Sequence, residues 1–405
     1  MHRRRLLAGA LAGLAALPLA RGARAQTPGS PSPAPALSDA ALAARASPAA
    51  AGPAMELALL ADAPSTPTGL AISPGGRVFV MMPRFTGTEP YTVGEVFADG
   101  RVAPYPDLAT NAADAAEAQG RLLHVTNGVF DTDGGLWLLD AGLPNGSGPP
   151  APGGAKLVRI DLASDRIDRT IPLSSGIVPT SSLNDLRVDT KDGRAQAFVT
   201  DQGQDGRGAI LAVDLETGRV ARRLHGHAST QSQPGVLKIV EGRPVMTRRA
   251  PGAPAQGVQG GANGIALSPD GARLYYAPLM GRHLYAVATA DLLDETASDA
   301  AVAAGVEDLG EKGFTGGLGC DAEGRVYLAM QELNAVGRRD EDGTITIVRT
   351  DPRLVWADTI AITADGWLYV SGAQVNRRPE YNEGRDLQRP PYAILRVRID
   401  AGPAQ

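Results

Sequence analysis

Cysteine, basic charge and long apolar runs are all scarce in this chain of 405 residues. A single cysteine excludes a disulfide within the chain. The formal net charge of −5 gives no basic footprint, so a nucleic-acid partner is not expected. No apolar run reaches the roughly 20 residues that cross a bilayer as a helix, so no stable membrane span is expected either.

Common catalytic motifs are also missing. The chain contains no Gly-x-Ser-x-Gly elbow, no His-Glu-x-x-His sequence and no P-loop pattern. These absences remove support for serine hydrolases, helical zinc proteases and nucleotide-cleaving enzymes of those kinds. Cys320 lies two residues after Leu318 in an alternating strand pattern, which predicts a small core residue rather than a reactive thiol.

Residues 1–25 are typical of an export signal. Three arginines, Arg3 to Arg5, precede an apolar run that ends near Ala20, and a small-x-small cleavage site follows at 23–25. The basic run resembles a twin-arginine signal, and a general secretory signal is also compatible with it. We therefore expect an exported protein, either periplasmic or secreted.

A linker and one folded domain are predicted after this signal. Residues 26–53 are almost all Ala, Pro, Ser and Gly, which bury too little apolar surface to offset the entropy of ordering them. We expect this segment to be disordered, and we expect residues 54–401 to fold as a single domain.

A short phrase recurs six times within the predicted domain. Each copy begins with a polar or small residue, which is usually followed by a glycine and then by an aliphatic residue. A turn glycine and a compact apolar strand come a few residues later. Strands such as 78–80 and 367–369 are rich in branched and aromatic residues. The spacing from one copy to the next is close to the roughly 40–50 residues expected for a four-stranded blade, with loops added. The sequence therefore predicts an all-β fold, a six-bladed β-propeller. The copies begin at Thr68, Asn127, Asn184, Asn263, Gly316 and Asp358.

These six first residues are expected to form a ring at one end of the central channel, because the innermost strand of every blade begins there. We call this ring the first column. Asn127, Asn184, Asn263 and Asp358 carry the side-chain oxygens that a hard cation prefers, so the ring is a candidate site for Ca²⁺ or another divalent cation. It is also a candidate site for a small organic ligand, together with His124. Capping of a turn is the structural alternative for each asparagine, and capping of a loop is the alternative for His124.

Two long excursions interrupt the repeats. Loops as long as 228–261 are usually functional or disordered, and this one is the predicted lid over the channel. The second excursion, 376–391, carries four arginines, for which an anionic ligand and a solvated charged loop are the two interpretations.

Several phrases resemble the Yellow/major royal jelly protein family. They lie at 183–189, 262–279 and 356–362, with a closing segment at 392–398, and the resemblance spans roughly residues 55–400. It implies a secreted six-bladed propeller that binds small organic ligands in its central channel.

The same phrases resemble, more distantly, the gluconolactonase/regucalcin and paraoxonase propellers. That resemblance implies a central divalent cation held by a glutamate, two asparagines and an aspartate. Asn184 and Asn263 match the two asparagine motifs, whereas Thr68 stands where the glutamate is expected and Gly316 where the aspartate is expected. Asp358, one blade later, is the candidate replacement for that aspartate.

Three functions therefore stay open. A small-molecule-binding propeller is favoured, because two carboxylate ligands of the metal site are missing. In the alternative, a metal-dependent lactone hydrolase, the cation would polarise the ring carbonyl while Asp358 or Asp185 takes a proton from the attacking water. A protein-interaction scaffold is the third possibility.

Overall fold

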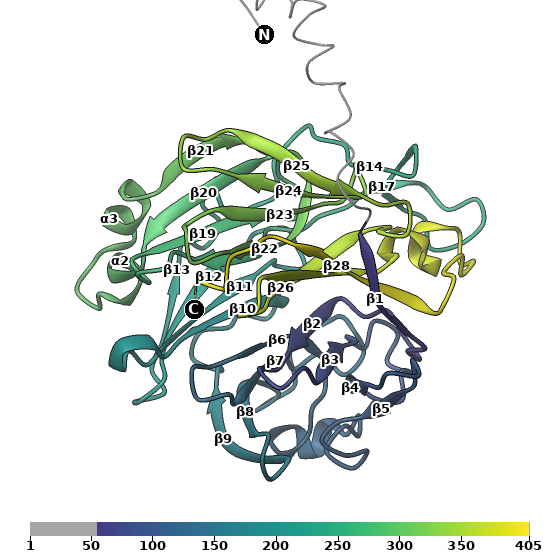
Figure 1. Cartoon of the computed structure of the whole chain (residues 1–405), viewed down its shortest axis with the longest axis horizontal. Coiled ribbons are helices and arrows are strands. Elements are labelled where there is room, and N and C mark those ends of the chain that lie inside the picture. The colour runs from purple at the N-terminus through teal and green to yellow at the C-terminus, as the bar shows by residue number, and fades with distance from the viewer. Residues whose placement is uncertain (1–54, 405) are drawn as a thin grey trace, which may run out of the picture. The chain divides into compact units, whose positions relative to one another are not determined.

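Short strands and tight turns alternate throughout residues 55–404, the part of the chain that the structure, a computed structural model, describes. The predicted export signal and linker lie outside the described residues. The strands form six four-stranded antiparallel sheets (Figure 1). The first three sheets contain β2 (Gly69–Ile72), β3 (Val78–Met81), β4 (Val93–Val96) and β5 (Val102–Pro104); β6 (Val125–Phe130), β7 (Leu136–Ala141), β8 (Ala155–Asp161) and β9 (Arg166–Pro172); and β10 (Leu183–Asp189), β11 (Gln196–Asp201), β12 (Ala209–Asp214) and β13 (Val220–Arg223).

The other three sheets repeat this order. They contain β18 (Ala262–Leu267), β19 (Arg273–Pro278), β20 (His283–Ala288) and β21 (Glu307–Glu311); β22 (Thr315–Cys320), β23 (Val326–Met330), β24 (Ala335–Arg339) and β25 (Ile345–Thr350); and β26 (Ala357–Ile362), β27 (Trp367–Gly372), β28 (Tyr392–Arg398) and β1 (Glu56–Ala61). Each sheet is one blade, and we number the blades in this order.

Pairing between the two ends of the described chain closes the ring. The first strand, β1, completes blade 6 by pairing with β28, with Ala61 opposite Tyr392. Figure 1 shows this purple strand beside the yellow end of the chain. The innermost strands of successive blades contact one another, and β26 contacts β2. The predicted six-bladed β-propeller is therefore confirmed, and the six inner strands surround its channel.

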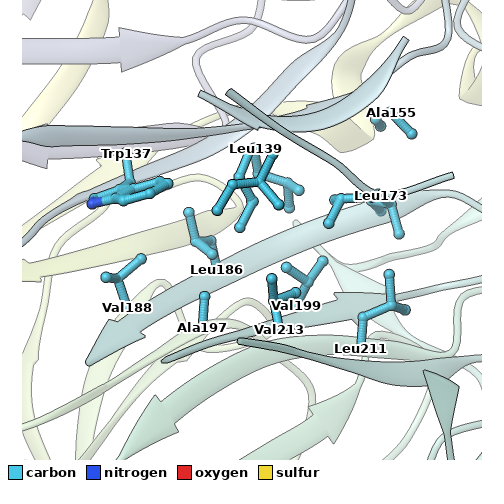
Figure 2. Close-up of a cluster of buried hydrophobic side chains, with 14 of the residues drawn as sticks. Trp137, Leu139, Ala155, Leu173, Leu186, Val188, Ala197, Val199, Leu211 and Val213 are labelled. Atoms are coloured by element: carbon cyan, nitrogen blue, oxygen red, sulfur yellow. The ribbon is translucent and has the colours of Figure 1, made fainter. Parts of the chain in front are cut away.

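Apolar side chains from facing sheets fill the space between blades. Between blades 2 and 3, Trp137 and Leu139 of β7 lie over Leu186 and Val188 of β10 (Figure 2). All four are buried, because alternate residues of a strand point to the same face of its sheet. This packing holds each inner strand in a fixed position along the channel.

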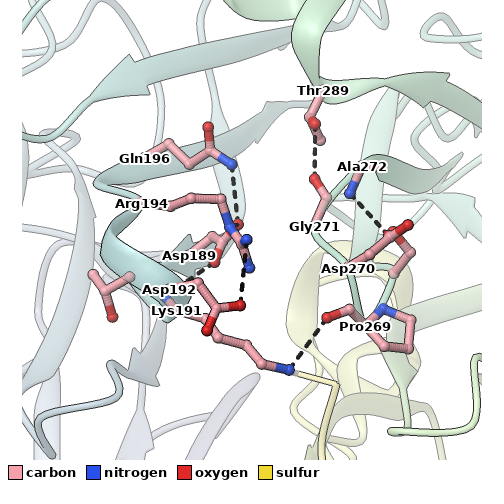
Figure 3. A network of polar contacts seen from close by, with 12 residues as sticks. Asp189, Lys191, Asp192, Arg194, Gln196, Pro269, Asp270, Gly271, Ala272 and Thr289 are labelled. Carbon is pink, nitrogen blue, oxygen red and sulfur yellow. Dashed lines mark hydrogen bonds and ion pairs between the residues drawn. The ribbon is translucent and has the colours of Figure 1, made fainter.

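The turns that follow the inner strands are held by side-chain oxygens. Asp189, at the end of β10, accepts hydrogen bonds from Arg194 Nε at 2.5 Å and from Gln196 Nε2 at 3.0 Å (Figure 3). Lys191 Nζ donates to Pro269 O at 3.3 Å, in the equivalent turn of blade 4. Neighbouring blades are therefore linked at this end of the channel.

The two excursions pack against each other at the opposite end. The first carries four two-residue strands, β14 (Ile239–Val240), β15 (Arg243–Pro244), β16 (Met246–Thr247) and β17 (Gln256–Gly257). It is joined to the second excursion by Arg248 N donating to Glu380 O at 2.6 Å and by an ion pair of 2.6 Å between Arg377 and Glu241. Both excursions contribute to a separate apolar cluster that includes Trp356.

Helices are few and short. Two lie between β20 and β21, namely α2 (Thr289–Leu293) and α3 (Asp299–Ala304), and the Ser298 hydroxyl caps the second by accepting from Ala301 N at 3.2 Å. Within residues 55–404, no helix has the length and apolar character that would let it cross a membrane.

Candidate functional site in the central channel

The channel has two ends, which we call the start end, where the six inner strands begin, and the hairpin end, where they turn into the second strands. Strand pairing shows which residues are equivalent between blades. Gly128 pairs with Leu138 in blade 2, and Leu186 pairs with the equivalent Val199 in blade 3. One step earlier along each inner strand, Asn127 is equivalent to Asp185.

The first column therefore differs from the sequence alignment at one position. The sequence repeat places Asn127 in the same column as Asn184. Strand pairing shows instead that Thr126 is the equivalent of Asn184 in blade 2. The Asn127-Gly128 pair resembles Asn184-Asp185 in sequence but lies one residue further along its strand. The first column consists of Thr68, Thr126, Asn184, Asn263, Gly316 and Asp358. The next layer, which we call the second column, consists of Gly69, Asn127, Asp185, Gly264, Gly317 and Thr359.

In the second column, Asn127 and Asp185 bind each other. Asn127 Nδ2 donates to Asp185 Oδ1, and Gly128 N donates to Asn127 Oδ1 at 2.6 Å, which fixes the orientation of the amide. The same Asp185 oxygen accepts from Leu186 N at 2.8 Å and from Arg187 Nη1 at 3.0 Å. Both side chains are buried, and their oxygens are already engaged by the chain itself.

Arg187 extends across the channel from β10 to β22. Its Nη2 donates to Leu318 O at 2.5 Å, while its Nη1 pairs with Asp185. Burial raises the pKa of Asp185, and the charge of Arg187 opposes that rise. The guanidinium thus compensates the buried carboxylate and connects blades 3 and 5.

Asp358 lies at the start end of β26 and is partly accessible. Burial, together with the charge of Asp185, raises the pKa of Asp358 to about 7, and Lys238 opposes the rise. A Cβ atom on Gly316 would lie 3.0 Å from Asp358 Oδ1. A side chain at position 316 would therefore meet the backbone of Ala357 as well as the Asp358 carboxylate, so a glycine fits there.

Lys238 comes from the first excursion and reaches the same end. Its side chain is fully buried, with Nζ 2.5 Å from Gln331 Oε1. The rings of Trp356 and Phe314 lie beneath the ammonium, with centroids 4.7 and 5.3 Å from Nζ. Burial lowers the pKa of Lys238 to about 7, and the charge of Asp358 opposes that fall. Sequence reasoning missed this residue, because a lysine within a loop carries no signal that it will be buried.

Several polar atoms at the start end have no partner among the described residues. Asn263 Oδ1, Thr315 Oγ1 and Gln331 Nε2 are buried without a hydrogen bond within residues 55–404. Asn184 is partly accessible, and its side chain makes no hydrogen bond to the described part of the chain. Buried polar groups are normally satisfied, so these atoms are available to water or to a ligand.

His124 is packed into a loop beside blade 1. Its Nδ1 lies 3.2 Å from Arg84 O, and its backbone N–H donates to Asp140 Oδ1 at 2.9 Å. Burial lowers the pKa of His124 to about 4, so the ring is neutral at pH 7. Of its two sequence interpretations, these contacts favour the loop role.

A cavity of about 580 Å³ occupies the hairpin end. Most of its wall is aliphatic or aromatic, and the inner part also contains Asn127 and Arg187. The C-terminal residues Pro403 and Ala404 border it. Its place at the hairpin end could not be predicted from the sequence, because its wall consists of ordinary strand residues. Typical wall residues are Leu70, Ile72, Val129, Phe130, Ile360 and Ile362.

The residues at the start end do not fit a divalent cation. Among the described residues, no group of three or more His, Cys, Asp or Glu side chains is placed to hold a metal ion. Asn127 turns its amide nitrogen toward Asp185, and Asp185 already binds Arg187. A metal ion beside Asp358 would also meet the ammonium of Lys238.

About two thirds of the chain matches the model of a known protein family. The model described as "Major royal jelly protein" matches residues 127–396. This segment runs from blade 2 to β28 and includes both excursions.

Relatives with curated descriptions match at low identity. "Protein yellow" of Drosophila subobscura is 27% identical over 241 residues, covering 56% of this chain and 39% of that protein. Major royal jelly protein 1 of Apis mellifera is 24% identical over 222 residues, covering 53% of this chain and 48% of that protein. The match therefore spans less than half the length of these relatives.

Solved structures share the fold. A calcium-binding protein, regucalcin, from Agrobacterium tumefaciens superposes with a TM-score of 0.52 at 18% identity, over 86% of this chain and 95% of its own. A gluconolactonase from Xanthomonas campestris gives a TM-score of 0.50 at 14% identity, over 85% and 90% of the two chains. At such identities the likeness concerns the propeller alone.

Proposed function

The chain belongs to the major royal jelly protein family, and from this premise and the geometry of its channel we propose that it binds a small organic molecule in the cavity at the hairpin end. The cavity carries the proposal. Its volume of about 580 Å³ falls within the roughly 300–1,000 Å³ of small-molecule sites.

The wall indicates the chemistry of the ligand. Leu70, Val129 and Ile360 offer apolar contacts to a hydrocarbon or aromatic part of a ligand. Arg187 and Asn127 offer hydrogen-bond donors at the inner part. A ligand with an apolar body and one polar acceptor group therefore suits the cavity.

Fluorescence of an anionic aromatic dye, 1-anilinonaphthalene-8-sulfonate, tests this proposal. Enhanced emission with the folded protein is expected, and Ala361→Trp should weaken it because the indole occupies part of the cavity that Ala361 lines. Leu108→Trp is the matched control, since Leu108 is exposed and does not line the cavity. Equal loss in both variants, or unchanged emission in Ala361→Trp, would contradict binding in the cavity.

The lactone hydrolase alternative has less support from the residues. It needs a divalent cation beside Asp185 and Asp358, whose charges are already opposed by those of Arg187 and Lys238. We assign no catalytic step to Asp185 or Asp358. Lactone turnover that is lost with a chelator and restored by calcium, and that Asp358→Ala abolishes, would favour the hydrolase over the binder.

Export to the periplasm or outside the cell forms part of the proposal. It rests on the arginines and the apolar run of residues 1–25. Replacing Arg3 and Arg4 by Lys separates the two routes, because a twin-arginine signal should lose export whereas a general secretory signal should keep it.

A further inference from the structure

The two excursions are more positively charged than the chain as a whole. Residues 228–261 and 376–391 contain eight basic and four acidic residues, a net charge of +4, whereas the whole chain has a net charge of −5. The two segments pack together at the start end, where Arg248 N donates to Glu380 O at 2.6 Å and Glu383 N donates to Arg248 O at 2.7 Å. Their charges therefore lie on one end of the propeller.

The acidic residues of the excursions are largely neutralised by arginines of the second excursion. The ion pairs are Glu241 with Arg377, Glu380 with Arg378 and Glu383 with Arg385. Asp386 is the acidic residue of the excursions that has no ion pair within residues 55–404, and Lys238 is buried. The remaining positive charge therefore belongs to exposed arginines.

Four exposed arginines of the excursions have no partner. Within residues 55–404 their side chains make no ion pair and no hydrogen bond. They are Arg243, Arg248, Arg249 and Arg389. Exposed arginines of the blades, such as Arg273 and Arg398, form ion pairs with neighbouring carboxylates. The excursions thus present positive charge that the chain itself does not compensate.

Exposed aliphatic side chains border these arginines. Ile239 N donates to Glu332 Oε1 at 2.8 Å, which brings Ile239 beside the turn between β23 and β24, and Leu387 N donates to Arg377 O at 2.9 Å. Four of the eight exposed large apolar residues in the described chain lie in the excursions or in that turn, and they are 38% to 52% exposed. They are Leu237, Ile239, Leu333 and Leu387. We call these four residues and the four unpaired arginines the docking face.

The hairpin end has the opposite character. Five of the six turns that follow the inner strands expose an acidic side chain. These residues are Asp133, Asp192, Asp270, Glu323 and Asp365. An anionic surface would therefore attract the docking face and not the hairpin end.

We propose that the docking face binds an anionic lipid membrane. Unpaired arginines attract the negative headgroups, and the bordering leucine and isoleucine side chains enter the boundary between headgroups and acyl chains. A soluble polyanion would use the arginines but would gain little from the aliphatic side chains, so a lipid surface fits the docking face better. In this orientation the cavity at the hairpin end faces away from the membrane.

Sedimentation of the full chain with lipid vesicles tests this inference. The protein should sediment with vesicles of equal parts phosphatidylglycerol and phosphatidylcholine but not with phosphatidylcholine alone, and added salt should weaken the binding. Arg248→Gln with Arg249→Gln should weaken it roughly tenfold or more. The matched control is Arg166→Gln with Arg169→Gln, which removes the same charge from the exposed outer strand β9 and should change binding less than about twofold.

Replacement of one exposed isoleucine separates a lipid surface from a soluble polyanion. Ile239→Ser should weaken binding to the mixed vesicles and leave binding to dextran sulfate unchanged. Ile167→Ser is the matched control on β9, because the exposed fractions of Ile239 and Ile167 are 38% and 39%. It should change neither.

Two results would overturn the inference. One is vesicle binding that survives the loss of Arg248 and Arg249, since it would then come from another part of the chain, such as residues 1–25. The other is binding to dextran sulfate without binding to vesicles, since the partner would then be a soluble polyanion. Neither result depends on which ligand the hairpin end binds.

A fluorescent label keeps the inference testable if the arginine variants do not fold. A nitrobenzofurazan label on Leu333→Cys, in a chain with Cys320→Ser, should brighten when the mixed vesicles are added, because the label moves into the less polar boundary of the bilayer. The same label on Ile167→Cys should not respond. Equal responses at the two positions would mean that the docking face does not meet the membrane.

Discussion

At the start end of the channel, the side chains of Lys238 and Trp356 are buried against each other, whereas at the hairpin end side chains such as Leu70 and Ile362 surround a cavity of about 580 Å³. The two ends belong to the same six strands. The start end differs because the chain inserts an excursion there and adds charged side chains to it. The cavity therefore lies at the end that the excursions do not cover, and its wall is more apolar than polar.

The largest expected difference between the two ends is in the free energy of unfolding that is lost when one partner of an ion pair is removed. Lys156 Nζ lies 2.8 Å from Asp140 Oδ2 at the start end of blade 2, and both side chains are almost completely buried. Lys156→Met leaves the carboxylate without its cation and should cost about 3–5 kcal/mol of unfolding free energy. Urea titration followed by tryptophan fluorescence measures it.

Arg398→Met is the matched control at the hairpin end. Arg398 pairs with Asp400 in a largely exposed bridge, so its loss should cost at most about 1 kcal/mol. Equal losses in the two variants would mean that burial does not set the contribution of an ion pair.

Added side-chain volume should also lower the free energy of unfolding by different amounts at different depths of the channel, and this difference should be smaller than that for the ion pairs. A Cβ atom on Gly264, in the second column, would lie 2.4 Å from Gly316 O, a backbone atom that cannot move alone. Gly264→Ala should therefore cost about 1–3 kcal/mol through overpacking.

The control for added volume is Ala361→Val in the wall of the cavity. The cavity has room for two more carbons, so the loss should stay below about 1 kcal/mol. Urea midpoints of both variants check the difference. A cavity wall as intolerant of bulk as the second column would contradict an accessible hairpin end.

The pH dependence of stability should report the buried cations of the start end. Burial, with the charges of Lys238 and Arg282, lowers the pKa of Lys312 to about 7 in the folded state. Between pH 7 and 10.5 the unfolded chain then binds more protons at this site, so stability rises with pH by up to about 1.4 kcal/mol per unit. Lys312→Met should flatten this rise, measured by urea unfolding at about pH 7.5 and 9.

Lys191→Met at the hairpin end provides the comparison, because Lys191 is only half-buried. It should keep the slope of the natural chain. A slope unchanged by Lys312→Met would contradict a buried cation at that position.

The sequence allowed the fold to be predicted because the signal for it is local and repeated six times. A turn glycine and a strand such as Val326 to Leu328 recur in every blade, and each copy is sufficient to indicate a hairpin. The first column was predicted in five of its positions for the same reason. Asn127 was misaligned by one residue, because its Asn-Gly-aliphatic sequence matches the phrase of the other blades, whereas strand pairing makes Thr126 the equivalent of Asn184.

Local sequence patterns could not predict the burial of Lys238 at the start end or the cavity at the hairpin end. Lys238 reaches Asp358 through an excursion whose path depends on contacts with the second excursion, such as the Arg377 pair with Glu241. Those contacts join residues more than a hundred positions apart in the sequence. The cavity depends on where side chains stop short of one another, which no local pattern records.

Reactivity of Cys320 should separate the two ends without any change in stability. Cys320 lines the cavity at the hairpin end, and burial raises the pKa of its thiol to about 12. Its reaction with 5,5′-dithiobis(2-nitrobenzoate) near neutral pH should be slow but measurable, and it should speed up about tenfold per pH unit as the thiolate forms. The anilinonaphthalene dye should slow this reaction by occupying the cavity.

A thiol placed at the start end by Thr315→Cys, with Cys320→Ser, should stay unreactive until the protein unfolds, because position 315 is 1% exposed. Equal rates for the two thiols would mean that both ends of the channel are open to solvent, and the contrast between them would then be wrong.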